Sequence, residues 1–289
     1  MRLVAFCAAI AAATMLSPLP ATAQTSCGQY DFASPFAGAF LAGEEFQGAA
    51  KAGETITTLA DGACHQDAVL KALKPTLGDV VGYKAAATSA GAQKQLGLDG
   101  PVLGVLLDKM MLDDGASVAI DDGARLIFEL DLLVRVKDPA LLDATTREEA
   151  LAGIDAVVPF IELGDLMVAK GAPITGPLLQ AMNAGARWGV AGTPVATAGM
   201  DADGLAASTG TLSLNGTMVA EAPATALLGH PLDAVLWIAN AAKARGMTFK
   251  EGDVLSLGGL GRFQLAAPGE VVADYAFGDQ AGSATVTLE

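Results

Sequence analysis

Positive charge is scarce in this chain, and its scarcity excludes several kinds of partner. The 289 residues include 17 Lys and Arg against 32 Asp and Glu, which gives a formal net charge of −15. Nucleic acids and anionic membrane surfaces both attract basic surfaces, so we expect neither as a partner. Charged residues make up only 17% of the chain and hydrophobic residues 52%. This balance argues against disorder and allows a sizeable buried core.

Histidine and cysteine are also rare, with two and three residues respectively. His65 adjoins Cys64, but no second Cys/His pair follows at zinc-ligand spacing, so a zinc site is not expected. No Ser/His/Asp or Cys/His arrangement can be assembled either. We interpret His65 as a surface helix residue and His230 as the N-terminal residue of a helix. The glycines at 258–261 do not form a G-x-G-x-x-G motif, which excludes a nucleotide-binding loop.

Long apolar runs are missing after the N-terminus, and the run at the N-terminus is short. Leu3–Leu16 follows a positive start and leads to an Ala-x-Ala pattern that ends at Ala23. This run is too short to span a bilayer and is typical of a secretory signal. We therefore predict a signal peptide at residues 1–23 and a periplasmic or secreted mature protein. No membrane association is expected once the signal is removed.

Two cysteines remain after removal of the signal, Cys27 and Cys64. An even pair in an oxidising compartment indicates one disulfide between them. The alternative is two unpaired thiols.

The remaining chain divides into two textures. Residues 24–77 are rich in small residues with helical spacing of Phe, and we predict a helical N-terminal appendage. Residues 78–289 contain many short apolar runs with few helices, without the regular β-α alternation of a doubly wound fold. The clearest elements are a hairpin around Asn215–Gly216 and a helix from His230 to Asn240. The pattern predicts a mixed, β-rich, barrel-like α+β domain.

One predicted strand, Arg125–Asp138, carries an unusual pair of acids. Its alternation places five apolar residues on one face, namely Phe128, Leu130, Leu132, Val134 and Val136. The opposite face carries Glu129 and Asp131, two carboxylates about 7 Å apart at Cα. A divalent cation would relieve their repulsion away from water. The alternative is a solvated face whose acids pair with Arg135 and Lys137.

Two further residues have both a chemical and an ordinary interpretation. Glu162 follows an apolar run, so it could complete a three-carboxylate set with Glu129 and Asp131, which suits Mg²⁺, Mn²⁺ or Ca²⁺. It could equally be a capping or turn carboxylate. Lys84 ends an apolar strand, where a lysine is usually a surface residue. It could instead grip a substrate carboxylate or move a proton beside a metal.

Several segments, in order, form a recognisable set of motifs. They are Gly82–Ser89, Gln93–Pro101 with Gly104, Gly229–Ala239, Lys250–Leu255 with Gly259–Gly261, and Gly282–Ser283. Together they resemble the motifs of the 2-keto-4-pentenoate hydratases of the fumarylacetoacetate hydrolase superfamily, and the resemblance covers roughly residues 36–289.

The resemblance implies a fold, a cofactor and a reaction class. The family has a mixed β-roll with flanking helices, is usually oligomeric, and binds Mg²⁺ or Mn²⁺ through a Glu-x-Glu strand and a later Glu. Those ligands fall at Glu129, Asp131 and Glu162, and the family lysine falls at Lys84. We add Asp165, in the motif that follows Glu162, as a second candidate catalytic residue. The implied substrate is a small 2-oxo acid such as 2-hydroxypenta-2,4-dienoate, hydrated or decarboxylated by a lyase in a homo-oligomer.

The chain departs from the motifs at several positions. Asp131 stands for a Glu, Leu166 and Met167 stand for a Ser-Arg, and Leu257 stands for a Thr. Two alternatives therefore accompany the hydratase-like lyase. One is a small-carboxylate-binding protein with little turnover, and the other is a hydrolase of acylpyruvate-type C–C bonds.

Overall fold

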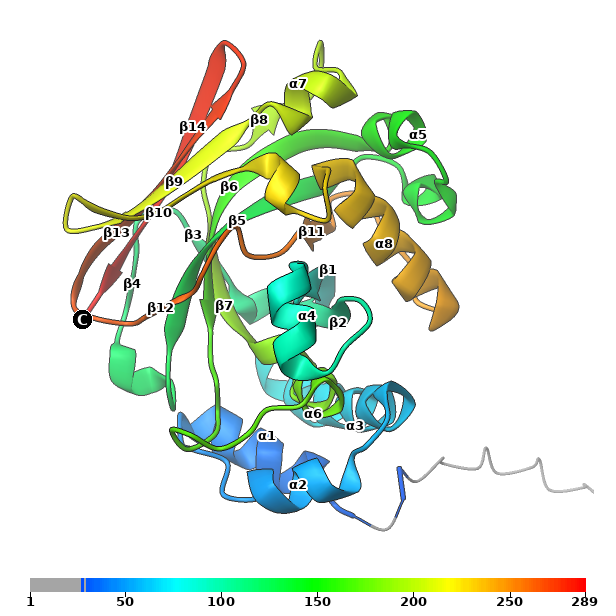
Figure 1. Ribbon diagram of the computed structural model, residues 1–289, viewed down its shortest axis with the longest axis vertical. Helices are drawn as coiled ribbons and strands as arrows, with labels where there is room; N and C mark the ends of the chain where they lie inside the picture. The colour runs from blue at the N-terminus through cyan, green and yellow to red at the C-terminus, as the bar shows by residue number, and fades with distance from the viewer. Residues whose placement is uncertain (1–26, 29) are drawn as a thin grey trace, which may run out of the picture.

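Two β-sheets and a set of flanking helices make up the structure, a computed structural model that describes residues 27, 28 and 30–289. The signal predicted at residues 1–23 lies outside these residues. A nine-stranded sheet curls through the centre, a five-stranded sheet lies against it, and α1, α2 and α3 lie at one end (Figure 1). This mixed architecture with a curled half-barrel confirms the predicted α+β fold class.

The nine-stranded sheet contains the strands that carry Lys84, Glu129, Asp131 and Glu162. Its main path is β2 (Val102–Leu107), β1 (Val80–Ala86), β11 (Val254–Ser256), β5 (Ile127–Val136), β6 (Ile154–Gly164), β7 (Ala186–Ala191) and β3 (Met111–Asp113). The two remaining strands are β12 (Gln264–Leu265), which pairs with β5, and β8 (Val195–Ala196), which pairs with β6. The β1–β11 and β3–β7 pairs are parallel, and the other pairs are antiparallel.

The five-stranded sheet covers the central strands from one side. Its order is β10 (Thr217–Pro223), β9 (Thr209–Leu214), β13 (Gly269–Phe277), β14 (Gln280–Leu288) and β4 (Ala116–Val118). The predicted hairpin joins β9 to β10, and Asn215 and Gly216 have φ of 51° and 74°, as a type I′ turn requires. Gly282 of β14 lies so close to β6 that a Cβ there would be 2.9 Å from the Pro159 side chain. The two sheets therefore pack tightly at this point.

Most of the helices begin after a residue whose side chain caps the first turn, and the first two do not. They are α1 (Ala33–Ala42), α2 (Ala49–Thr55), α3 (Leu59–Leu77), α4 (Ala90–Leu96), α5 (Arg147–Ala152), α6 (Gly176–Ala181), α7 (Ala202–Ala206) and α8 (Pro231–Ala244). Thr58 and Thr146 form capping boxes with the acids three residues later, before α3 and α5. Pro231 occupies the first position of α8, as predicted from its fixed φ.

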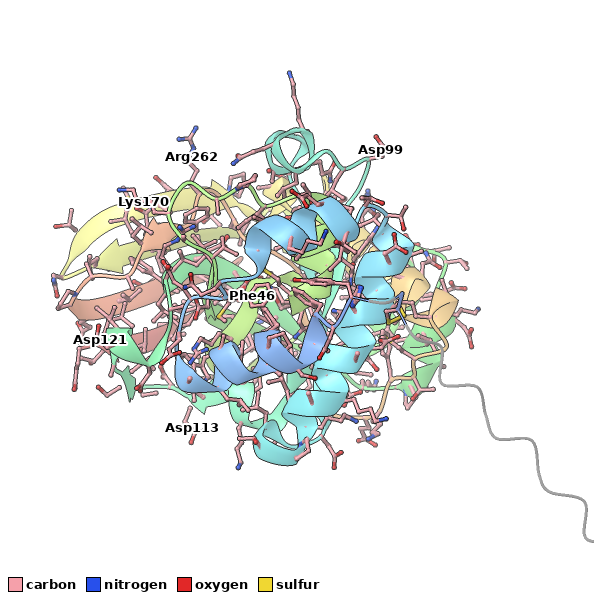
Figure 2. All side chains as sticks on the ribbon, turned by 90° about the horizontal axis from the view of Figure 1, so that it is seen from below. Phe46, Asp99, Asp113, Asp121, Lys170 and Arg262 are labelled. Atoms are coloured by element: carbon pink, nitrogen blue, oxygen red, sulfur yellow. A yellow bond between two sulfur atoms is a disulfide. The ribbon has the colours of Figure 1, made fainter. Side chains whose placement is uncertain are left out.

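The N-terminal helices pack through phenylalanines. Phe32 stacks on Phe36 with ring centroids 5.0 Å apart, and Phe46 meets both rings edge-on. Figure 2 views these helices from outside, with the Phe46 side chain among them and the charged side chains of Asp99, Lys170 and Arg262 at the rim. These phenylalanines belong to the same buried cluster as the apolar face of β5. The division into an appendage at 24–77 and a main domain at 78–289 stays a prediction.

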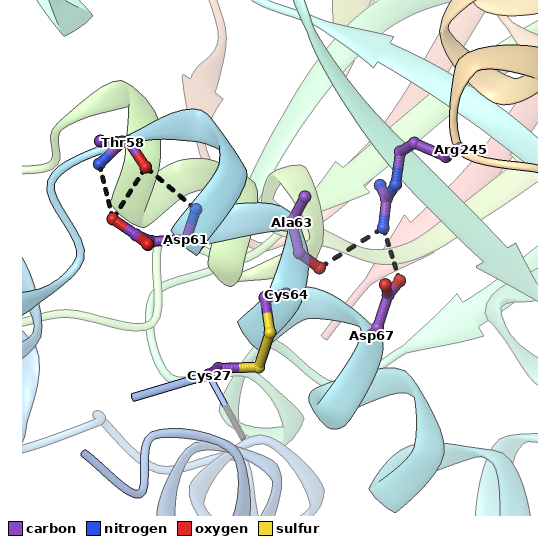
Figure 3. Close-up of a disulfide and its surroundings, with 7 residues drawn as sticks. All are labelled: Cys27, Thr58, Asp61, Ala63, Cys64, Asp67 and Arg245. Atoms are coloured by element: carbon purple, nitrogen blue, oxygen red, sulfur yellow. Dashed lines mark hydrogen bonds and ion pairs between the residues drawn. A yellow bond between two sulfur atoms is a disulfide. The ribbon is translucent and has the colours of Figure 1, made fainter. Parts of the chain in front are cut away.

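A disulfide ties the first described residues to α3. The structure pairs Cys27 with Cys64, with Cα atoms 5.6 Å apart (Figure 3). Beside it, Arg245 donates to the Asp67 carboxylate at 2.5 Å and to the Ala63 carbonyl at 3.4 Å. The disulfide thus attaches the segment containing Cys27 to α3, and Arg245 attaches α3 to the end of α8.

The prediction for His65 was wrong, whereas that for His230 is confirmed. His65 is only 3% exposed and meets the rings of Tyr30 and Phe32 edge-on. Burial lowers the pKa of His65. His230 caps α8, because its Nδ1 accepts from the Leu232 N–H at 3.0 Å. In the described part of the chain, no helix combines the length and apolar character needed to cross a membrane.

Candidate active site

Three acids meet on one face of the central strands. Glu129 and Asp131 lie two residues apart on β5, and Glu162 of β6 is the cross-strand partner of Glu129. Because side chains alternate along a strand and directly opposed residues share a face, all three carboxylates lie on the same side of the sheet. Asp131 is 0% exposed and Glu162 5%. The solvated-face alternative for Asp131 is therefore wrong, and Arg135 pairs with Asp155 instead, at 2.8 Å.

The apolar face of β5 explains why this acidic face can be buried. The five predicted apolar residues, Phe128, Leu130, Leu132, Val134 and Val136, are each at most 1% exposed and belong to the main core. Leu133, Val158 and Phe160 form a second buried cluster with Ala156. Because Leu133 follows Asp131 by two residues, this second cluster extends along the acidic face. The two central strands are therefore buried on both faces, which a simple alternation pattern does not reveal.

Lys84 extends from β1 towards these acids. It is 3% exposed, forms an ion pair with Glu162 and donates to the Ala184 carbonyl at 3.3 Å. The surface alternative for Lys84 is therefore wrong. Gly104 of β2 lies opposite Lys84, and a Cβ at Gly104 would come within 2.5 Å of the lysine Cγ. The lysine stem thus fills space that only a glycine leaves open.

Ser256 and a glycine turn hold Asp131 in place. The Ser256 hydroxyl donates to one Asp131 carboxylate oxygen at 2.5 Å, and the Gly258 N–H donates to the other at 3.0 Å. Ser256 is 0% exposed and is the β-partner of both Lys84 and Leu133. Sequence reasoning missed Ser256. Strand alternation offered a signal, because Ser256 lies one residue before the apolar Leu257 and so points to the face opposite that of Leu257.

The same turn also covers Glu129. A Cβ on Gly259 would lie 2.0 Å from a carboxylate oxygen of Glu129, so a larger residue there would push this carboxylate aside. Burial raises the pKa of Glu129 to about 8, with Glu162 and Asp131 adding to the rise and Lys84 opposing it. Burial, followed by Glu162, raises the pKa of Asp131 to about 7, although the Ser256 hydrogen bond opposes this. If all three acids were ionised, the cluster would hold more negative charge than Lys84 balances, which is why the pKa values of Glu129 and Asp131 are raised.

The donor set suits a hard divalent cation in chemistry but not in its present arrangement. Three carboxylates from adjacent strands are the ligands that Mg²⁺, Mn²⁺ and Ca²⁺ take in proteins. Among the residues that the structure describes, however, no group of three His, Cys, Asp or Glu side chains is arranged to hold a metal ion. In this arrangement Glu162 pairs with Lys84, and Asp131 accepts hydrogen bonds from Ser256 and Gly258. The chemistry of the three carboxylates fits a hard divalent cation.

Asp165, the other candidate catalytic residue, accepts hydrogen bonds from backbone N–H groups. Its carboxylate accepts from the N–H groups of Ala124 and Arg125 at 2.9 Å and of Met167 at 3.0 Å. It also lies 3.5 Å from the guanidinium of Arg187. These contacts describe a residue that fastens the end of β6 to the segment before β5. A catalytic role for Asp165 stays a prediction.

Arg187 is a second residue that sequence reasoning missed. It lies on β7, 4% exposed, between the rings of Phe40 and Trp188 at 4.7 and 4.2 Å. Its Nη1 donates to the Phe40 carbonyl at 2.9 Å, whereas its buried Nε has no hydrogen-bond partner among the described residues. With Lys84, Glu162 and others it lines a cavity of about 10 Å³, so an organic acid would require these side chains to move.

Comparison with known proteins finds relatives that are named as hydratases. A 2-hydroxyhexa-2,4-dienoate hydratase from Comamonas testosteroni is 33% identical over 195 residues, covering 66% of this chain and 72% of the relative. A 2-keto-4-pentenoate hydratase from Paraburkholderia xenovorans is 28% identical over 193 residues, covering 66% of this chain and 70% of the relative. No family model matches the chain.

Solved structures show the same fold. The 4-oxalocrotonate decarboxylase from Pseudomonas putida G7, complexed with magnesium and adipate, aligns with a TM-score of 0.76 at 24% identity. That alignment covers 88% of this chain and 94% of the decarboxylase. The fumarylpyruvate hydrolase from Pseudomonas aeruginosa, in complex with Mn²⁺ and pyruvate, aligns with a TM-score of 0.52 at 11% identity, over 71% of this chain and 88% of the hydrolase. With the sequence relatives, these findings place the chain in the 2-keto-4-pentenoate hydratase-like family of the fumarylacetoacetate hydrolase superfamily.

Proposed function

We propose that this protein is a divalent-metal-dependent lyase that hydrates a small 2-oxo acid such as 2-hydroxypenta-2,4-dienoate. The observation that carries the proposal is the pairing of Glu129 with Glu162 across β5 and β6, beside Asp131 and the buried Lys84. Relatives named as hydratases of 2-oxo acid intermediates support the substrate class. Relatives named 4-oxalocrotonate decarboxylase make decarboxylation of a related dioate the nearest variant of this reaction.

The residues divide into metal ligands and substrate-handling groups. Glu129, Asp131 and Glu162 would hold Mg²⁺ or Mn²⁺, which supplies Lewis-acid stabilisation of an enolate when bound. The buried Lys84 offers a charged donor beside these carboxylates, suited to binding a substrate carboxylate or to holding a proton. Ser256 keeps Asp131 oriented, and the turn at Gly258–Gly259 shields the carboxylates from water.

The test is turnover with added Mg²⁺ or Mn²⁺. We expect the ultraviolet absorbance of 2-hydroxypenta-2,4-dienoate to disappear and 4-hydroxy-2-oxopentanoate to form. Glu129→Gln and Glu162→Gln should each abolish turnover and weaken Mn²⁺ binding by at least about tenfold, because each removes one anionic ligand. Glu270→Gln, an exposed acid on β13, is the matched control and should leave both unchanged. Unchanged Mn²⁺ binding in both cluster variants would refute the ligand assignment.

One observation favours a binding protein without turnover as the second candidate. Met167, where the family motif has an arginine, is 1% exposed and packs in the main core, so it offers no charge to a substrate. Saturable binding of the dienoate with no product would support this candidate over the lyase. Release of two acids from an acylpyruvate would instead indicate a C–C hydrolase.

We further propose that the protein works outside the cytoplasm, in the periplasm or as a secreted protein. The signal-like residues 1–23 and the Cys27–Cys64 pair both favour an oxidising compartment. Fractionation of cells that express the full chain tests this location. A mature N-terminus at Gln24 in the exported fraction is expected, and an uncleaved chain that remains in the cytosol would refute it.

A further inference from the structure

Charge is unevenly distributed around the three carboxylates. Glu129, Asp131 and Glu162 share one face of the sheet. Lys84 forms an ion pair with Glu162 and is the cation that acts on the pKa values of Glu129 and Asp131. Buried charges are costly unless they are paired, so the lysine is the group that makes this arrangement tolerable without a metal. The Lys84 ammonium neutralises the Glu162 carboxylate, as a bound metal cation would.

The position of Lys84 is built in by its neighbours. Its stem lies against Gly104, where a Cβ would be 2.5 Å from Cγ and 3.0 Å from Cδ. Its ammonium lies between Glu162 and the Ala184 carbonyl, and Ser256 is its β-partner on β11. The side chain is therefore directed at Glu162 by packing, with few alternative positions.

A divalent ion and this ammonium both require Glu162. Two cations within a few ångströms in a poorly hydrated site repel each other strongly. We propose that Lys84 occupies the cation position of the carboxylate cluster in the metal-free protein, and that a divalent ion enters only as Lys84 leaves Glu162. This inference rests on the proposed function, because it assumes the same three ligands.

The exchange has a consequence for the substrate. Once displaced from Glu162, the Lys84 ammonium has its donors free for an incoming carboxylate. Metal loading therefore precedes substrate binding, and the lysine that pairs with Glu162 in the metal-free protein binds the substrate carboxylate in the metal-loaded protein.

The test measures Mn²⁺ affinity of the chelator-treated full-length protein by the electron paramagnetic resonance of free Mn²⁺. Lys84→Met removes the competing cation and should bind Mn²⁺ at least about tenfold more tightly than the wild type. Lys109→Met removes one exposed lysine and should leave the affinity unchanged. Equal or weaker binding by Lys84→Met would overturn the inference.

A second variant decides the matter if Lys84→Met does not fold. Lys84→Arg keeps the charge and binds a carboxylate with two parallel hydrogen bonds, so it should be harder to displace and should weaken Mn²⁺ binding several-fold. Binding as tight as in the wild type would contradict displacement. Failure of the wild type and both variants to bind Mn²⁺ would refute the proposed function as well, whereas binding by all three with equal affinity would refute only the displacement.

Discussion

Asp131 has the shorter side chain of the two acids on β5, and its hydrogen bonds reflect that length. Its carboxylate is held by the Ser256 hydroxyl, the Gly258 N–H and the Leu132 N–H, at 2.5, 3.0 and 2.6 Å. Glu129 reaches further and lies under Gly259. The two acids therefore differ in role, because Asp131 also anchors the turn that covers the site.

Replacement of Ser256 tests this anchoring. Ser256→Ala removes a buried hydrogen bond to a charged group, which should lower the free energy of unfolding by about 1.5–3 kcal/mol. Urea unfolding with chelator present measures this. Ser213→Ala, at a partly exposed strand position of β9, is the control and should cost less than about 0.5 kcal/mol. A loss as small as the control's would mean that the hydroxyl does not hold Asp131.

The raised pKa of Glu129 predicts how stability depends on pH in the metal-free protein. The folded state holds this proton up to about pH 8, whereas the unfolded carboxyl releases it near 4.5. The stability contributed by the protonated group is present below pH 4.5 and is lost as the pH rises towards 8. With chelator present, the melting temperature of the wild type should therefore fall relative to that of Glu129→Gln between pH 5 and 8. A constant difference across this range, measured by calorimetry, would contradict the prediction.

At the scale of elements, strand register assembles the site. The hydrophobic runs indicated β5 and β6 separately, but only their pairing sets Glu129 opposite Glu162. Lys84 and Ser256 become neighbours in the same way, through the parallel pairing of β1 with β11. Residues 84, 129, 162 and 256 are far apart along the chain, so no local pattern could predict these pairs.

Asn183 joins three elements, and its replacement tests that joint. It lies between α6 and β7, and its amide bonds both the N–H and the carbonyl of Val105 on β2, at 2.9 and 2.8 Å. Gln66 of α3 also donates to its oxygen, at 2.7 Å. Asn183→Ala should lower the free energy of unfolding by about 3 kcal/mol. It removes the partners of the buried Val105 N–H and carbonyl, and it places alanine at a residue with φ of 56°.

Asn215→Ala provides the comparison for this prediction. Asn215 has a similar φ of 51°, but its side chain bonds the Glu270 N–H and the Pro268 carbonyl in the exposed β9–β10 turn, so its loss should cost about 1 kcal/mol. Denaturant unfolding of both variants therefore compares buried with exposed side-chain hydrogen bonds at residues of similar φ. Equal losses would indicate that the Asn183 amide contributes little.

At the scale of the whole molecule, the disulfide covalently links two segments that are distant along the chain. Cys27 and Cys64 are 37 residues apart, and closing a loop of this size stabilises a fold by up to about 4 kcal/mol in the chain-entropy description. Cys64→Ala or reduction should therefore lower the thermal midpoint without abolishing Mn²⁺ binding, because the carboxylate cluster lies on other elements. Loss of Mn²⁺ binding on reduction alone would show that α3 and the cluster are coupled.

The sequence by itself determined the elements and the chemical inventory. The Asn215–Gly216 turn, the helix after His230 and the apolar face of β5 follow from local rules of backbone conformation and side-chain alternation. The candidate ligands Glu129, Asp131 and Glu162 follow from strand alternation and the apolar run before Glu162, and the motif resemblance implies the same three residues. Only the tertiary structure decided that Asp131 and Lys84 are buried, that His65 is inside, and that Ser256 and Arg187 line the same small cavity as Lys84. The reason is physical: burial and electrostatic pairing depend on which strands lie side by side, and that is a property of the sheet as a whole.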